Sequence, residues 1–188
     1  MEIRREILLI IMLLVVIAVL VKIVEFFQVT SVEADASKFV KEDLHSKYPT
    51  ADIEIMSMVP KENYLEVKTK MTLGLESPCP ERRHIFYNYP AQNFVPQPDE
   101  IITSNCAVCT AGLCTIAFPE EAIIASHTFP GTSDIKVYIF DNPNAIPIVK
   151  EMSDSWIVTW NSQTADYYYT ISIHRNGTIL SLDSISKS

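Results

Sequence analysis

Two stretches near the C-terminus, "SWIVTWN" (155–161) and "DYYYTISIHRNGTILSLD" (166–183), decide the fold. Each begins by placing apolar residues at every second position, the period of a strand with one buried face. Asn176-Gly177 is the strongest short signal for a tight hairpin. We therefore predict an antiparallel sheet here. The side chains expected on its core face are Trp156, Val158, Trp160, Tyr167, Tyr169, Ile171 and Ile173.

A helix is predicted just before this sheet. "FPEEAIIASHTF" (118–129) carries a proline at the first helical position and two glutamates in the first turn. The next segment, "SDIKVYIF" (133–140), alternates its branched apolar residues and is predicted as a strand. Residues 141–154 are interpreted as an insert between this strand and the next one.

Residues 31–73 show a similar order. A helix is predicted first, and the proline at position 49 ends it. Two alternating strands follow at 51–59 and 63–73, joined by turn residues. One interpretation is a tandem repeat of helix plus hairpin. The predicted core face of the helix contains Ala36, Phe39, Val40, Leu44 and Tyr48.

The order of helix, Pro-Gly stop, strands and the "HRNGTILSLD" hairpin (174–183) resembles the PepSY-type domain. The resemblance is best over 119–185, and 31–73 looks like a degenerate copy. It implies an α+β fold, with helix-on-antiparallel-sheet units of a PepSY-like or cystatin-like kind. It also implies an extracytoplasmic binding or inhibitory module. The chain departs from the pattern in the 141–154 insert and in lacking an Asn-Gly hairpin in its first half.

The N-terminus is strongly apolar. No polar residue occurs from Ile7 to Val21, and Lys22 follows. With Phe26 and Phe27 included, residues 7–27 approach the roughly 20 apolar residues that cross a bilayer. We therefore predict a signal-anchor transmembrane helix whose partner is the lipid bilayer, although a small-residue triplet at 34–36 keeps cleavage open.

Charge predicts the orientation of this anchor. Arg4 and Arg5 precede the apolar run, whereas acidic residues predominate after it, which favours a cytoplasmic N-terminus. The expected location is a single-pass cell-membrane protein with an extracytoplasmic, or extracellular, C-terminal part. Asn176-Gly177-Thr178 is a candidate glycosylation site compatible with that side.

The chain divides on this basis into four segments: 1–29 as stub and anchor, 30–73 as the first unit, 74–114 as a connector and 115–188 as the second unit. The connector holds five of the 11 prolines and all 4 cysteines. A strand is expected at its "RRHIFYNY" stretch (82–89), and little other regular structure.

The cysteines admit three interpretations. Outside the cytoplasm, an even number of cysteines favours two disulfides that tie the connector, with the pairing left open. The alternative is a zinc site of four thiolates, because Cys106 and Cys109 have knuckle spacing. Redox chemistry at this pair is a further alternative, although no helix follows it. The residues in both sets are Cys79, Cys106, Cys109 and Cys114.

Charge and motif content exclude some classes of function. A net charge of −8 argues against a nucleic-acid partner, and no phosphate-binding glycine loop occurs. Arg82, Arg83 and His84 form a possible anion-binding surface. We expect a non-catalytic binding or inhibitory module for a peptide or protein, without a cofactor. The alternatives are a four-cysteine zinc or redox protein at the cell surface, and a structural subunit of an envelope complex.

Overall fold

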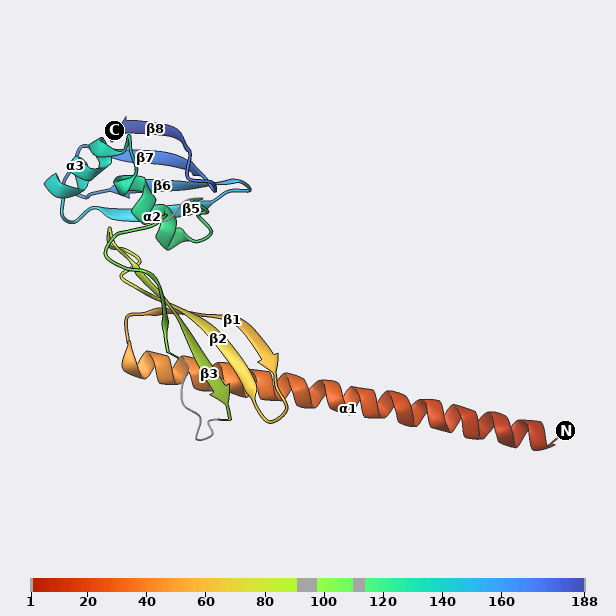
Figure 1. The fold of residues 1–188 in the computed structure, drawn as a ribbon. Coiled ribbons are helices and arrows are strands. Elements are labelled where there is room, and N and C mark those ends of the chain that lie inside the picture. Colours follow the sequence, from red (N-terminus) through yellow and green to blue (C-terminus); the bar gives the residue numbers. More distant parts are fainter. Residues whose placement is uncertain (1, 91–97, 110–113, 188) are drawn as a thin grey trace.

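The computed structural model describes residues 2–90, 98–109 and 114–187, except for the side chains of 2–11 and 24–31. The fold is α+β, with two four-stranded antiparallel sheets in the orders β1-β2-β3-β4 and β5-β6-β7-β8. Each sheet and its helical cover form one unit, and the two units are stacked end to end (Figure 1). The first unit comprises α1 (Glu2–Lys47), β1 (Asp52–Pro60), β2 (Leu65–Leu73), β3 (Glu81–Tyr89) and β4 (Glu100–Thr103). The second comprises α2 (Pro119–Thr128), α3 (Ser133–Asp141), β5 (Ile146–Glu151), β6 (Ser155–Asn161), β7 (Tyr167–His174) and β8 (Ile179–Ser186).

The first core lies between the C-terminal part of α1 and one face of its sheet. Ala36, Val40 and Leu44 recur at helical spacing and are fully or almost fully buried, as the periodicity predicted, whereas Phe39 of the same predicted face is 38% exposed. They pack against the alternate residues of β2, including Val67 and Met71. The helix ends at Lys47, just before the proline at position 49.

The transmembrane helix predicted for residues 7–27 is corrected by the structure. Within the part of the chain that is described, no helix is both long and apolar enough to cross a membrane. Residues 7–27 lie within α1, which continues unbroken to Lys47 and extends well beyond the sheet at its N-terminal end (Figure 1).

The second core lies between its sheet and the two short helices. Trp156, Val158 and Trp160 on β6 are buried, and so are Ile171 and Ile173 on β7, which confirms these five predicted core residues, whereas Tyr167 is 39% exposed. All five belong to one apolar cluster with residues of α2 and α3. The two units therefore have separate apolar cores.

Two predictions about the second unit are wrong. The segment 133–140, expected to be a strand, forms helix α3, because its apolar residues also fit helical spacing: Ile135 and Tyr138 are both buried, three positions apart. The 141–154 insert contains strand β5, which holds Pro147 at the edge of the sheet, where a missing N–H is tolerated. The expected strand at 82–89 is confirmed as β3, and β4 joins it in the first sheet.

Candidate functional site

The four cysteines form two disulfides. Cys79 pairs with Cys106, 27 residues away, and Cys109 pairs with Cys114, with Cα–Cα distances of 4.8 and 4.9 Å. The first bridge joins the loop between β2 and β3 to the turn that follows β4. In that turn, Asn105 and Cys106 both have a φ of 56°, a left-handed conformation that is uncommon outside glycine. The disulfide alternative of the sequence is therefore the one that the structure contains.

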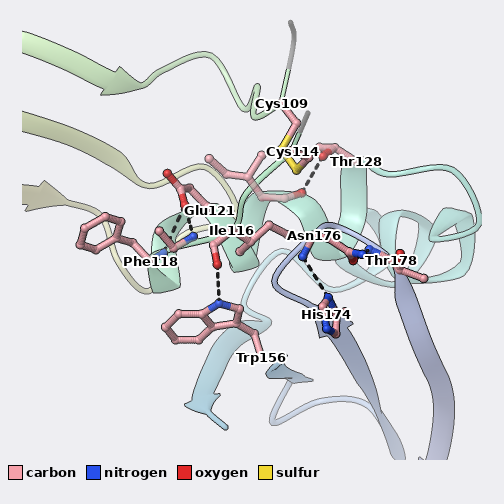
Figure 2. The surroundings of a disulfide bond; sticks show 12 residues. Cys109, Cys114, Ile116, Phe118, Glu121, Thr128, Trp156, His174, Asn176 and Thr178 are labelled. Carbon is pink, nitrogen blue, oxygen red and sulfur yellow. Dashed lines mark hydrogen bonds between the residues drawn. A yellow bond between two sulfur atoms is a disulfide. The ribbon is translucent and has the colours of Figure 1, made fainter. Parts of the chain in front are cut away.

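The second bridge packs on the last hairpin. Gly177 has a φ of 87°, and a Cβ there would lie 3.1 Å from the Cys114 Sγ and from a ring carbon of Phe129. The Asn-Gly turn thus leaves room for the disulfide (Figure 2). Just beyond it, the Ile116 N–H donates to the Arg175 carbonyl at 2.7 Å, and the Ile116 carbonyl accepts from the Trp156 indole at 2.9 Å. These bonds hold the chain against the second sheet before α2 begins.

The first bridge meets a buried histidine, His127, near the C-terminal end of α2. The Nε2 of His127, on α2, lies 3.6 Å from the Cys106 Sγ. Its Nδ1 lies 2.9 Å from the Ile123 carbonyl, to which it can only donate. Ligand atoms of Cys79, Cys106 and His127 all lie within 4.8 Å of one another, a group that includes only two of the four cysteines. Nothing in the local sequence signals this meeting, because His127 is 21 residues from Cys106.

Burial sets the protonation of this histidine. Desolvation lowers the pKa of His127, and the positive charge of Lys136 acts in the same direction, against the bond to the Ile123 carbonyl. The ring also packs edge-on against Trp160, with centroids 5.6 Å apart. A pocket of about 560 Å³ opens beside it, lined by residues that include Cys106, His127, Gly131 and Lys136. A neutral imidazole thus borders both a disulfide and an open pocket.

A charge network joins the two units. Glu120, in the first turn of α2, is 1% exposed and lies 3.7 Å from the Lys70 ammonium and 3.9 Å from the Arg82 guanidinium. It also accepts a hydrogen bond from Thr72. Arg82 bonds Glu121 at 2.8 Å. Sequence reasoning assigned the two glutamates to the helix dipole alone, but they also pair with cations from β2 and β3.

The predicted anion-binding surface is placed largely in this interior. Arg82 is 3% exposed and its guanidinium stacks 4.0 Å from the Phe118 ring centroid. His84 is also buried, and its Nδ1 lies 3.4 Å from Glu100. Burial, followed by the charge of Lys68, lowers the pKa of His84. Arg83 points to the other side of the strand, so the three side chains do not converge on one site.

The candidate glycosylation residue Asn176 is exposed at the tip of the β7–β8 hairpin. Its backbone N–H donates to His174 at 3.1 Å, and its side-chain oxygen accepts from the Thr178 N–H at 3.0 Å. The turn therefore uses the amide oxygen and leaves the side-chain nitrogen, the atom that carries a glycan, out of these two bonds (Figure 2).

The second sheet has one face without a buried residue, which we name the open face. Its members alternate with the core residues and are neighbours in the strand register, as in the row Ile148, Thr159 and Thr170. Apolar side chains stand out on it, with Ile148 54%, Ile146 44% and Ile185 39% exposed. The open face comprises Ile146, Ile148, Lys150, Ile157, Thr159, Asn161, Tyr168, Thr170, Ser172, Ser181, Asp183 and Ile185.

Comparisons with known proteins give no family. No family model matches the chain, and no curated protein matches it. Among solved structures, a candidate lipoprotein from Clostridium difficile 630 aligns with 77% of this chain and 90% of its own, at 11% identity and a TM-score of 0.26. At that level the likeness supports no statement about fold or function.

Proposed function

We propose that this chain is an extracytoplasmic, non-catalytic binding module that holds a protein partner on the open face of its second sheet. The observation that carries the proposal is the composition of that face. A solvated face of an antiparallel sheet is normally polar. Here four isoleucines and Tyr168 share it with small hydroxyl side chains, and several large apolar side chains on one exposed face are a feature of interaction sites.

The two disulfides support the extracytoplasmic location in this proposal. Two bridges that use all 4 cysteines of the chain persist in an oxidising environment and are rare in the cytosol. The resemblance to PepSY-type domains, which implies the same compartment and a binding role, stays a prediction.

Side chains, and not sheet-edge pairing, are proposed to make the contact. β5 carries Pro147, and the β7–β8 register shifts at Ser172 and Ile173. Proline and bulges at sheet edges prevent the pairing of a further strand. The open face between these two edges leaves its side chains accessible to a partner.

The test is site-specific photo-cross-linking in cells that make the full chain. A benzoylphenylalanine placed at Thr159 on the open face should give a discrete protein adduct. The same probe at Asp134, exposed on α3 on the other side of the sheet, should give none. Ile148→Glu should remove the adduct at position 159 while the disulfides and circular dichroism stay unchanged. Equal labelling at both positions, or an adduct insensitive to Ile148→Glu, would contradict the proposal.

A further inference from the structure

The contact between His127 and the first disulfide is chemically incomplete in the oxidised protein. The Nδ1 of His127 donates to the Ile123 carbonyl, so the lone pair of a neutral ring lies on Nε2. That lone pair faces the Cys106 Sγ at 3.6 Å. A disulfide sulfur carries no proton, so it cannot donate to the nitrogen. Either a thiol proton or a metal ion would complete the contact, and both require the bridge to open.

We propose that Cys79, Cys106 and His127 form a zinc site that the disulfide closes and that reduction opens. The ligand set, two thiolates and one imidazole, is one that Zn²⁺ prefers. Bond lengths of about 2.3 Å to sulfur and about 2.0–2.1 Å to nitrogen place these two ligand atoms about 3.5 Å apart around a tetrahedral ion. The observed separation of Nε2 and the Cys106 Sγ is 3.6 Å.

The hydrogen bond on the other ring nitrogen of His127 and the pocket beside the ring also fit a zinc site. A zinc-bound histidine almost always donates its other ring N–H to a carbonyl or carboxylate, and the Ile123 carbonyl already holds that position. The adjoining pocket leaves space for a fourth, exchangeable ligand. The site is also shared: the two cysteines come from the first unit and the histidine from α2 of the second.

Reduction is a thiol–disulfide exchange with a dithiol. Cys79 is exposed and Cys106 is half-buried, so the thiolate of the dithiol attacks the Cys79 sulfur. The Cys79–Cys106 bond breaks and Cys106 leaves as a thiolate beside His127. The second thiol of the reductant then attacks the mixed disulfide, which releases Cys79 as a thiolate and the reductant as its own disulfide. Zn²⁺ binds both thiolates, and the two protons of the dithiol pass to solvent.

The test uses the full chain with Cys109→Ser and Cys114→Ser, so that only one pair of thiols remains. The protein is reduced with dithiothreitol, desalted without oxygen and titrated at pH 7.5 with Co²⁺ as a spectroscopic substitute for Zn²⁺. We expect one Co²⁺ per chain, thiolate-to-cobalt charge-transfer bands, and displacement by Zn²⁺. The oxidised protein should bind none. His127→Gln should weaken binding at least tenfold, since even changes behind a ligand commonly weaken it about 10–100-fold.

Two controls keep the result interpretable. His45→Gln removes an exposed histidine on α1 and should leave the Co²⁺ affinity unchanged. Co²⁺ at His127 should also quench Trp160, because the two rings pack 5.6 Å apart; Trp156→Phe leaves Trp160 as the sole reporter. Absence of charge-transfer bands, or His127→Gln binding Co²⁺ as tightly as the parent, would each overturn the proposal.

Discussion

Replacement of Glu120 by Gln is the sharpest test of the junction between the units. Glu120 is 1% exposed and carries the charge shared by Lys70 at 3.7 Å and Arg82 at 3.9 Å. At an effective dielectric constant of about 20, these pairs are worth about 4.5 and 4.3 kcal/mol. Gln keeps the shape and an oxygen that can accept from Thr72, but it removes both attractions.

The net loss is smaller than their sum. Removing a buried charge recovers several kcal/mol of desolvation. Lys70 keeps Glu54 and Arg82 keeps Glu121, each at 2.8 Å. We expect Glu120→Gln to lower the free energy of unfolding by about 3 kcal/mol, the lower end of the range for a broken buried pair. At about 2–4 °C per kcal/mol for a chain of this size, Tm should fall by about 6–12 °C.

The assay is urea unfolding followed by tryptophan fluorescence, which reports on the second unit because both tryptophans, Trp156 and Trp160, lie on β6. The matched control is Glu42→Gln, which breaks an exposed pair with Lys38 at 3.9 Å and should change stability by less than about 1 kcal/mol. If Glu120→Gln costs no more than this control, the network does not stabilise the junction, and the Coulomb argument fails.

The remaining predictions concern one buried histidine and one glycine. Burial lowers the folded-state pKa of His84, so the unfolded chain binds more protons at this residue than the folded chain does. The stability that neutral His84 contributes is therefore fully present above its unfolded-state pKa of about 6.5. That stability is lost as the pH falls through the folded-state pKa. The free energy of unfolding should therefore decline below about pH 6.5, and it should decline less steeply in His84→Gln than in the parent. His45→Gln, at an exposed histidine, should follow the parent. Parallel pH profiles for all three proteins would contradict this prediction. Gly177→Ala should lower stability by about 1–2 kcal/mol through its left-handed backbone alone, and further through the 3.1 Å approach of its Cβ to the Cys114 Sγ. Gly131 has a similar φ of 89°, but a Cβ at this position would lie 3.8 Å from its nearest neighbour, in Ile179. Thermal unfolding should therefore show a smaller loss of stability for Gly131→Ala than for Gly177→Ala. Equal losses would exclude a packing role for Gly177.

Local sequence predicted the elements whose two faces differ. On β6, alternate residues are buried because one face meets α2 and the other does not. The same rule failed at 133–140, where Ile135 and Ile139 satisfy both the strand and the helix period in a segment too short to separate them. It also missed β5, because Pro147 argues against a central strand and its edge position was not visible in the sequence.

The candidate sites were harder to predict, because their residues meet only through tertiary contacts. The cysteine count indicated two disulfides, but the pairing depends on which strands bring Cys79 beside Cys106. His127 and Glu120 carry ordinary helix-terminal roles in sequence, and both acquire partners only when α2 meets the first unit. A buried hydrogen bond between residues 48 positions apart, such as that from Thr72 to Glu120, leaves no periodic signal.

The first disulfide contributes more to stability than the second, and it also lies at the junction between the two units. In the chain-entropy model, a 27-residue separation is worth about 3.6 kcal/mol and a five-residue one about 2 kcal/mol. Apolar contacts cross the junction, because Leu75 and Val108 pack against the second core. Directional contacts add to them: the charge network around Glu120 and the contact of His127 with Cys106. Because these contacts are directional, they restrict how the two units can be oriented as well as contributing to stability. In the proposed reduced state, a zinc ion would replace the van der Waals contact with coordinate bonds from both units. Reduction would then remove one constraint on the first unit while metal binding adds another across the junction, so that redox state and metal together set how firmly the second sheet is held.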